Sequence, residues 1–273
     1  MAELMRTALI LSNEGIATNI FRMTLQCPEI ASQARPGQFV TLPPLDELTT
    51  WRRPFTVYGR DSERLTIVYR VVGRNTALYA QLTGGREISL IGPLGQPAVI
   101  NPAVKEFWLV AGGCGLAPLR YILQRIEKTA PEAKVRVLAG FAAKNEVFGH
   151  DDIDASYGRG TFKVATDDGS YGFHGTVVDL LSQALRERDG ENGDTLPKPE
   201  ELAVYTCGPR RMMAAVAAII VGRGSTCHAL LEARMACGGL DACKGCVVKT
   251  TDGLKQVCQD GPVFDAAKII WEE

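Results

Sequence analysis

The pattern of apolar residues and turns changes near residue 104, and this change constrains the fold more than any other feature. Before it, short β-rich runs such as "RLTIVYRVVG" alternate with Gly, Pro or charged turns. After it, apolar strands, glycine turns and amphipathic helical patterns alternate, as in "KEFWLVAGGCGLAPLRYILQRIEK". Regularly spaced short strands indicate a closed barrel or a sandwich, and alternating strands and helices indicate a parallel sheet. We therefore predict a β domain at residues 1–102, an α/β domain at 103–224 and a small cysteine-rich module at 225–273.

The composition excludes several classes of protein. The 273 residues are 46% hydrophobic and carry a formal net charge of −1, so neither disorder nor a nucleic-acid or polybasic membrane surface is indicated. No apolar run approaches the ~18 residues of a transmembrane helix, and the run from Ala8 to Leu11 is too short for a signal peptide. We expect a cytoplasmic protein whose thiols stay reduced.

Four of the eight cysteines lie in the last module with the spacing C-x5-C-x2-C-x11-C: Cys237, Cys243, Cys246 and Cys258. A closed zinc site is one reading, but zinc ribbons usually bring two C-x2-C pairs and only one is present. Thiol–disulfide catalysis needs its C-x2-C at a helix start, whereas "DACKGCVV" leads into a β-branched run. A plant-type 2Fe–2S site combines one C-x2-C pair with a distant fourth cysteine. The spacing favours iron–sulfur and leaves zinc open.

Three motifs in the α/β region indicate a nucleotide. In "LVAGGCGLAPL", a strand ends in Gly112, Gly113 and Gly115 before a helix, which is the geometry that presents backbone N–H groups to phosphate. "TCGPRRMM" repeats the strand-to-helix turn at Cys207–Pro209. "TDDGSYGFHG" places Asp168 in a glycine loop, and such loops at the carboxyl ends of parallel strands bind nucleotides. Each motif alone is also compatible with an ordinary turn.

A fourth motif, "RRPFTVYG", places an arginine, an aromatic ring and a hydroxyl side by side in the β region. Such a set could clamp a phosphate and hold a planar ring, although an ordinary barrel strand would have the same pattern.

The order of these four motifs resembles the ferredoxin–NADP reductase superfamily over roughly residues 5–222. The resemblance implies an antiparallel FAD-binding barrel followed by a parallel-sheet domain that binds a pyridine nucleotide. It implies that Arg53 clamps the flavin pyrophosphate, that Phe55 lies along the isoalloxazine and that Thr56 places a hydroxyl near N5. The other implied FAD residues are Pro54, Val68, Tyr69, Arg70, Asn75 and Thr76. The implied nucleotide residues are Gly112, Gly113, Gly115, Asp168, Gly208 and Pro209, with Cys207 near the position of hydride transfer.

The cysteine module sharpens the resemblance. "E-x-R-M-x-C-G" and "V-C-x-D-G-P-V-F" resemble the electron-transfer subunits of class 1B dihydroorotate dehydrogenases, and the resemblance extends along the chain. It implies that the four cysteines ligate a 2Fe–2S cluster. It also implies a role in pyrimidine biosynthesis. Electrons would pass between NAD(H), FAD, the cluster and an FMN-containing catalytic subunit. The implied assembly is a heterotetramer.

The loop between the first two cysteines departs from the family pattern. It has five residues, "GGLDA", where the family usually has four, and Asp241 in this loop could compete as an oxygen ligand. The chain also resembles the small subunit of electron-bifurcating NADH-dependent ferredoxin:NADP oxidoreductases, in which the first ligand is an aspartate rather than a cysteine. Two alternatives remain: a subunit of another dehydrogenase, and a zinc-stabilised redox or binding module. Lys144 would suit NADPH, but the acidic "TDDGS" loop favours NADH.

Overall fold

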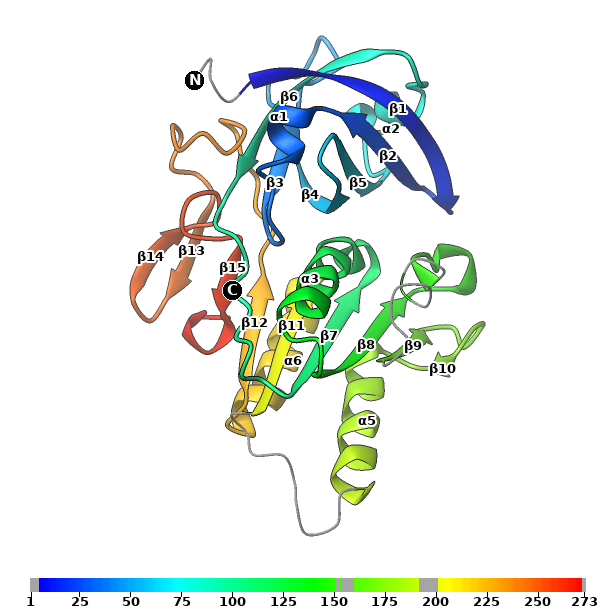
Figure 1. Cartoon of the computed structure of the whole chain (residues 1–273), viewed down its shortest axis with the longest axis vertical. Helices are drawn as coiled ribbons and strands as arrows, with labels where there is room; N and C mark the ends of the chain where they lie inside the picture. The colour runs from blue at the N-terminus through cyan, green and yellow to red at the C-terminus, as the bar shows by residue number, and fades with distance from the viewer. Residues whose placement is uncertain (1–4, 151–152, 154–159, 192–200, 272–273) are drawn as a thin grey trace. The chain divides into compact units, whose positions relative to one another are not determined.

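The computed structural model describes residues 5–150, 153, 160–191 and 201–271, which form two compact units (Figure 1). One unit runs to Ala98 and also contains Leu231–Val263, and the other comprises Val99–Leu230 and the chain from Phe264. The cysteine-rich segment therefore groups with the N-terminal barrel. The division into three domains with boundaries after residues 102 and 224 stays a prediction.

The first unit is built on a closed antiparallel barrel with the strand order β1-β2-β5-β4-β3-β6 (Figure 1). Closure leaves no sheet edge unpaired, which is why a chain of short strands is stable in this form. The predicted antiparallel barrel is confirmed. Its strands are β1 Met5–Ala17, β2 Ile20–Gln26, β3 Phe39–Leu42, β4 Arg53–Arg60, β5 Arg64–Arg70 and β6 Glu87–Leu94, with the short helices α1 Pro28–Ala31 and α2 Arg74–Ala80.

Alternation along the strands fills the barrel. On β2, Met23 and Leu25 are fully buried, and on β5 Leu65 and Ile67 are fully buried as well. Side chains at every second position of a strand share a face, so the predicted β-branched and aliphatic runs supply a continuous interior.

The second unit is a seven-stranded sheet with the order β10-β9-β8-β7-β11-β12-β15. The pairs from β10 to β12 are parallel. The predicted parallel sheet is confirmed. Its strands are β7 Glu106–Gly112, β8 Lys134–Phe141, β9 Gly160–Thr166, β10 Phe173–His174, β11 Leu202–Cys207, β12 Thr226–Leu230 and β15 Val263–Asp265. Its helices are α3 Leu116–Thr129, α5 Val177–Glu191 and α6 Arg210–Gly222, with 3-10 turns η2 Gly113–Gly115, η3 Lys144–Glu146 and η5 Ala266–Lys268.

Helices cover both faces of this sheet. α3 packs on β7 and β11 from one face, and α5 and α6, which contact each other, pack on the opposite face (Figure 1). Residues 106–111 of β7 are therefore all buried, as expected for a central parallel strand. In the sheet, β8 and then β9 lie on one side of β7, and β11 and then β12 lie on its other side. The carboxyl ends of β7 and β11 thus meet where the strand order reverses, the usual nucleotide position in such sheets.

The chain leaves this sheet after β12 and returns to it as β15. Between them lie the four clustered cysteines and the antiparallel hairpin of β13 Val247–Thr250 and β14 Gly253–Gln256 (Figure 1). At the crossing point, the Leu231 N–H donates to the Pro262 carbonyl at 2.9 Å. β12 itself is a strand of the sheet, although the sequence placed residues 226–230 in the C-terminal module.

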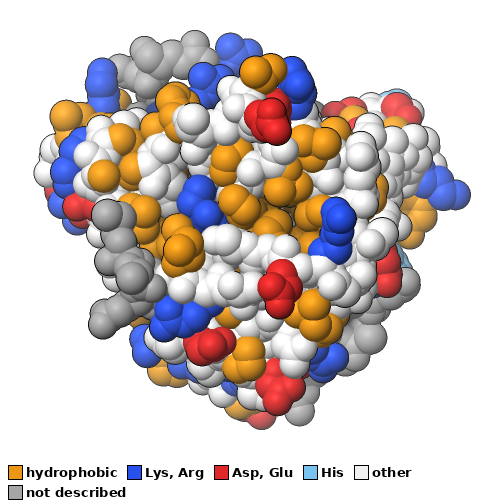
Figure 2. All heavy atoms as spheres, turned by 90° about the horizontal axis from the view of Figure 1, so that it is seen from above, with side chains coloured by type: hydrophobic (Ala, Val, Ile, Leu, Met, Phe, Trp, Pro, Cys, Tyr) orange, Lys and Arg blue, Asp and Glu red, His pale blue; other side chains and the backbone are white. Residues whose placement is uncertain are grey.

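On the face in Figure 2, basic and acidic side chains are scattered among apolar ones, in keeping with the net charge of −1. Among the described residues, no helix is both long and apolar enough to cross a membrane.

Candidate redox-cofactor sites

The start of β4 is partly open to solvent. Residues 53–56 are half-buried, whereas residues 57–59 are buried. The ring of Phe55 packs edge-on against Tyr69 and Tyr79, with centroids 5.6 and 5.7 Å away. This end of the strand thus presents a guanidinium, a firmly held aromatic ring and a hydroxyl together, which is a donor set that fits a flavin dinucleotide.

The two tyrosines behind Phe55 are fixed by their hydroxyls. Tyr69 donates to Asn13 Oδ1 at 3.0 Å, and Tyr79 donates to the Pro43 carbonyl. Burial raises the pKa of both Tyr69 and Tyr79 to about 12, so both remain neutral donors at physiological pH. The predicted neighbours on β5 differ in exposure, since Val68 is buried and Arg70 is half-buried.

Arg52 and Arg53 have different environments although they are adjacent. The Arg52 guanidinium donates to the Thr41 carbonyl at 2.8 Å and to the Ser89 carbonyl at 2.7 Å, so it joins β3 to β6. Burial lowers the pKa of Arg52. The Arg53 guanidinium donates to the Trp51 carbonyl of its own segment. Arg52 is therefore a structural residue of the barrel, and Arg53 is the better placed of the two for a ligand.

Asn75 and Thr76 hold turns with their side chains. Asn75 Oδ1 accepts from the Leu45 N–H at 2.7 Å, and its amide donates to Thr49 Oγ1 at 2.7 Å. Thr76 Oγ1 accepts from the Val72 N–H at 2.9 Å at the start of α2. Both side chains would therefore shape a flavin site by fixing the loops around it.

Glycines interlock the loops that follow β7 and β11. A Cβ atom on Gly115 would lie 2.1 Å from the Cys207 carbonyl oxygen, and one on Gly208 would lie 2.9 Å from Gly112 Cα. Gly113 has a φ of 52°, in the left-handed region that glycine adopts most easily. The structure therefore brings these two predicted motifs together at the reversal of strand order.

The second of these loops leads directly into α6. Cys207 is buried as the last residue of β11, and Pro209 precedes the first helical residue, Arg210. A proline at this place fixes the backbone where the helix begins. The Cys207 thiol thus lies at the carboxyl edge of the two central strands.

The third predicted nucleotide residue lies in the loop after β9. Asp168 Oδ1 accepts from the Ser170 hydroxyl at 2.6 Å and from its N–H at 2.9 Å, and these hydrogen bonds lower the pKa of Asp168. The Lys144 N–H donates to the same Ser170 Oγ at 2.8 Å. An ionised Asp168 suits a ribose hydroxyl and repels a 2′-phosphate.

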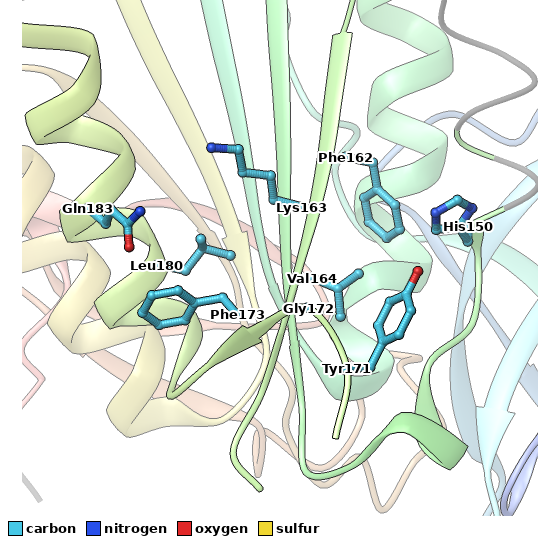
Figure 3. Close-up of a pocket in the computed structure, with 9 residues that line it drawn as sticks. All are labelled: His150, Phe162, Lys163, Val164, Tyr171, Gly172, Phe173, Leu180 and Gln183. Carbon is cyan, nitrogen blue, oxygen red and sulfur yellow. The ribbon is translucent and has the colours of Figure 1, made fainter. Parts of the chain in front are cut away.

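A pocket of about 490 Å³ wraps around the edge of the sheet near this loop. The rings of Phe162, Tyr171 and His150 lie on one side of β9, and Lys163 and Phe173 lie on the other (Figure 3). Consecutive strand residues point to opposite faces, which explains this division. The volume is in the range of small-molecule sites, and the sequence reasoning missed this pocket.

The four clustered cysteines lie as two neighbouring pairs. The thiols of Cys237 and Cys243 are hydrogen-bonded, and the Cys258 N–H donates to Cys246 Sγ at 3.4 Å. Across the described part of the chain, no three His, Cys, Asp or Glu side chains surround one point as a single metal ion would need. Two adjacent pairs match the four cysteines of a cluster with two irons.

Backbone amides surround the Cys237 sulfur. Burial opposes its ionisation, but hydrogen bonds from the N–H groups of Cys243, Ala242 and Leu240 and from the Cys243 thiol outweigh burial and lower the pKa of Cys237 to about 7. N–H donors directed at sulfur stabilise a thiolate and the clusters that thiolates hold. The loop therefore fits the group that its spacing predicts.

The Asp241 carboxylate is hydrogen-bonded to two side chains rather than placed as an oxygen ligand. Its Oδ1 accepts from Lys244 Nζ at 2.5 Å and from Gln256 Nε2 at 2.8 Å. The structure therefore gives no support to the alternative in which Asp241 competes as an oxygen ligand.

The cysteine loop packs closely onto the barrel within the first unit. A Cβ atom on Gly239 would lie 2.9 Å from the Phe39 ring, and one on Gly238 would lie 3.1 Å from Arg52 Cβ. Phe39 is in turn the register partner of Thr56 across β3 and β4. The candidate flavin strand and the candidate cluster loop are thus separated by one side chain of β3. Neither Phe39 nor Arg52 was singled out from the sequence.

Comparison with known proteins gives a consistent result. The family described as "Iron-sulfur cluster binding domain of dihydroorotate dehydrogenase B" matches residues 232–270, and "Oxidoreductase NAD-binding domain" matches residues 109–218. A "Dihydroorotate dehydrogenase B (NAD(+)), electron transfer subunit" of Caldanaerobacter subterraneus is 32% identical, covering 97% of this chain and 98% of the relative. The chain belongs to this family. A subunit of the same description from Enterococcus faecalis is 33% identical, with 96% of each chain covered.

Solved structures agree with the fold described above. An NADH-dependent reduced ferredoxin-NADP oxidoreductase, studied for flavin-based electron bifurcation, superposes with a TM-score of 0.83 at 26% identity, covering 97% of this chain and 90% of that chain. A Neisseria gonorrhoeae ferredoxin NADP+ reductase with bound FAD and NADP has a TM-score of 0.68 at 19% identity, covering 86% of this chain and 96% of that chain. The predicted family is confirmed, and the individual site residues stay predictions.

Proposed function

We propose that this chain transfers electrons between NAD(H) and a partner flavoprotein, and that it holds FAD and a 2Fe–2S cluster to do so. When bound, the flavin exchanges a hydride with the nicotinamide and the cluster exchanges single electrons, so together they link two-electron and one-electron chemistry. The observation that carries the proposal is the contact series Thr56–Phe39–Gly239, which brings the candidate flavin strand and the cysteine loop together within one unit.

The barrel residues bind and orient the flavin in this proposal. Arg53 supplies charge to the pyrophosphate, because its guanidinium lies at the half-buried end of β4. Phe55, held by two tyrosines, supports the ring system, and the Thr56 hydroxyl lies at the end nearest Phe39. Pro54, Val68, Tyr69, Arg70, Asn75 and Thr76 shape the surrounding walls and loops.

The α/β unit binds the dinucleotide. The glycine turn Gly112–Gly115 lets the pyrophosphate approach the backbone, and Cys207–Pro209 faces the nicotinamide end. Asp168, kept ionised by Ser170, accepts from the ribose and selects NAD(H) over NADP(H). The aromatic pocket beside this loop offers a place for the adenine.

The four cysteines would together hold the two irons of the cluster: Cys237, Cys243, Cys246 and Cys258. The partner is an FMN-containing catalytic subunit of the dihydroorotate dehydrogenase type, as the relatives' description as electron transfer subunits suggests. We place the assembly, a hetero-oligomer, in the cytoplasm, where thiols stay reduced.

The test has two arms. The purified protein should show flavin absorbance and about two irons with acid-labile sulfide per chain. Zinc without iron, or a chain that never binds flavin, would overturn the cofactor assignment. Co-purification of the native complex, followed by a dihydroorotate–NAD assay, then tests the partner.

A second candidate function is the small subunit of an electron-bifurcating NADH-dependent ferredoxin-NADP oxidoreductase, favoured by the TM-score of 0.83 along 97% of the chain. Cys237 at the first ligand position argues against it. Reduction of ferredoxin by the native complex, with no turnover of dihydroorotate, would favour this candidate over the first.

A further inference from the structure

The chain between β3 and β4, residues 43–52, is fixed against the start of α2, and we call it the β3–β4 loop. The Thr49 N–H donates to the Asp46 carbonyl at 3.0 Å, which closes a turn within the loop. Asn75 Oδ1 accepts from the Leu45 N–H at 2.7 Å, and the Asn75 amide donates to Thr49 Oγ1 at 2.7 Å. These hydrogen bonds give the loop a defined conformation.

The β3–β4 loop engages two arginine side chains. The Trp51 carbonyl accepts from the Arg53 guanidinium, and Asp46 Oδ2 lies 2.9 Å from Arg74 Nε. Arg53 begins β4, and Arg74 begins α2, which follows β5 in the chain. Because β4 and β5 are antiparallel, the start of β4 and the end of β5 lie at the same end of the barrel. Both guanidinium groups therefore lie at the end of the barrel that carries the candidate flavin strand, and the sequence reasoning singled out only Arg53.

The ion pair between Asp46 and Arg74 is buried on one side only. The Asp46 side chain is 5% exposed, whereas that of Arg74 is 71% exposed. In the second unit, Glu106 and Arg188 are each 6% exposed, as in a pair that serves the fold alone. The Asp46 carboxylate is also held by the backbone, since its Oδ1 accepts from the Leu48 N–H at 3.0 Å. A fixed, buried carboxylate thus orients a guanidinium that stays open to solvent.

A guanidinium that is both oriented and exposed is suited to a phosphate. Taking a carboxylate out of water costs free energy, and an exposed ion pair returns little of it, so fold stability alone does not account for this arrangement. A side chain oriented in advance loses less entropy when it binds an anion. The Arg74 Nε faces Asp46, which leaves the two terminal nitrogens to donate to phosphate oxygens.

We propose that Arg74 is a second phosphate-binding residue of the flavin site: it binds the pyrophosphate of FAD together with Arg53, and the buried Asp46 is the positioning residue that orients it. This inference rests on the proposed function, because it requires the flavin. A pyrophosphate carries two charged groups, so two guanidinium groups on neighbouring segments match it better than one.

The experiment follows the release of FAD from the full-length holoprotein on dilution, by the fluorescence of the free flavin. R74A should raise the Kd for FAD about 10- to 100-fold, as expected for the loss of a charged hydrogen-bond donor. R64A is the matched control, because Arg64 is also exposed and also pairs with an aspartate, Asp61, but at the opposite end of β4 and β5. R64A should leave the Kd unchanged.

Two further measurements separate phosphate binding from a change in the loop. Salt screens exposed charges, so the Kd of the wild type should rise with NaCl concentration, and that of R74A should rise less steeply. D46N keeps an oxygen for the Leu48 N–H but removes the charge that orients Arg74. It should therefore raise the Kd severalfold in the wild type and have no further effect in the R74A background.

A Kd of R74A equal to that of the wild type overturns the inference, and so does a raised Kd with unchanged salt dependence. If R74A lowers the Tm because Asp46 is left without its partner, R74A/D46N decides, since it removes both charges: a raised Kd supports the role of Arg74, and a wild-type Kd overturns it. Wild-type protein that holds no FAD overturns the proposed function as well. Wild-type binding that none of these variants weakens overturns only the role of Arg74.

Discussion

A side-chain carbon on Gly239 would lie 2.9 Å from the ring of Phe39, closer than Cβ atoms approach their neighbours in folded proteins. Gly239 also has a φ of 84°, which L side chains rarely adopt. The cysteine loop can therefore lie on the barrel only because this residue is glycine.

We expect Gly239→Ala to destabilise the cysteine loop by about 2–4 kcal/mol, combining backbone strain with overpacking. The variant should lose iron and show a lower Tm in a thermal scan. Gly253→Ala is the matched control, because Gly253 has a φ of 98° but no atom within 4 Å of its added Cβ. Equal losses in the two variants would show that contact with Phe39 is unimportant.

Arg53→Ala should weaken FAD binding while leaving the barrel folded. Loss of a charged hydrogen-bond donor costs about 1.5–3 kcal/mol, roughly a 10- to 100-fold rise in the Kd. Fluorescence of released FAD measures this change. Arg52→Met should instead lower the Tm of the apoprotein, since Arg52 bonds Thr41 and Ser89. If both variants had the same effect, the separate roles of the two arginines would be refuted.

Gly115→Ala should impair reaction with NADH, because its Cβ would lie 2.1 Å from the Cys207 carbonyl oxygen and must push the two loops apart. A displacement of about 1 Å in a hydride-transfer site lowers kcat/KM by roughly 100-fold. NADH–ferricyanide activity of the flavin-loaded protein gives the readout. Gly222→Ala, on α6 with open space around it, should leave activity unchanged.

Several features of the site were predictable from the sequence because they depend on local pattern. Strand alternation indicated the barrel, and glycine turns after apolar strands marked the loops that Gly115 and Gly208 interlock. The Phe39 contact was not predictable, because it joins residues 200 positions apart in the sequence. The structural role of Arg52 was not predictable either, since only the folded barrel shows that its guanidinium meets the Thr41 carbonyl. β15 was missed because three residues carry no periodicity.

Glu106→Ala should destabilise the α/β unit by about 3–5 kcal/mol, because it leaves buried positive charge uncompensated. Glu106 accepts from Arg188 Nε at 2.8 Å and from Arg136 Nε at 3.1 Å, and Arg188 is only 6% exposed. Urea unfolding measures the difference. Glu201→Ala breaks the exposed pair with Lys105 and should change stability by less than about 1 kcal/mol. A small effect at Glu106 would contradict the burial argument.

His228 should make the stability of the same unit depend on pH. Burial lowers the pKa of His228 below its ordinary 6.5, although Asp265 opposes this, and the ring stacks on Tyr205 at 4.8 Å. Below pH 6.5 the unfolded chain binds a proton that the folded chain excludes, so the free energy of unfolding falls as the pH falls. His228→Phe keeps an aromatic ring and should flatten this dependence in urea unfolding between about pH 5.5 and 7.5. Parallel pH curves for the two proteins would refute it.

The hydrogen bond between Leu231 and Pro262 has a consequence for how such a protein can evolve. It joins the two points where the chain departs from and rejoins the sheet. The two ends of the cysteine-rich segment therefore lie within one hydrogen bond of each other. An ancestor without that segment would need only a short turn to close the same gap. Iron–sulfur chemistry can therefore be gained or lost by this scaffold through a single insertion or deletion, with the barrel and the dinucleotide sheet left intact.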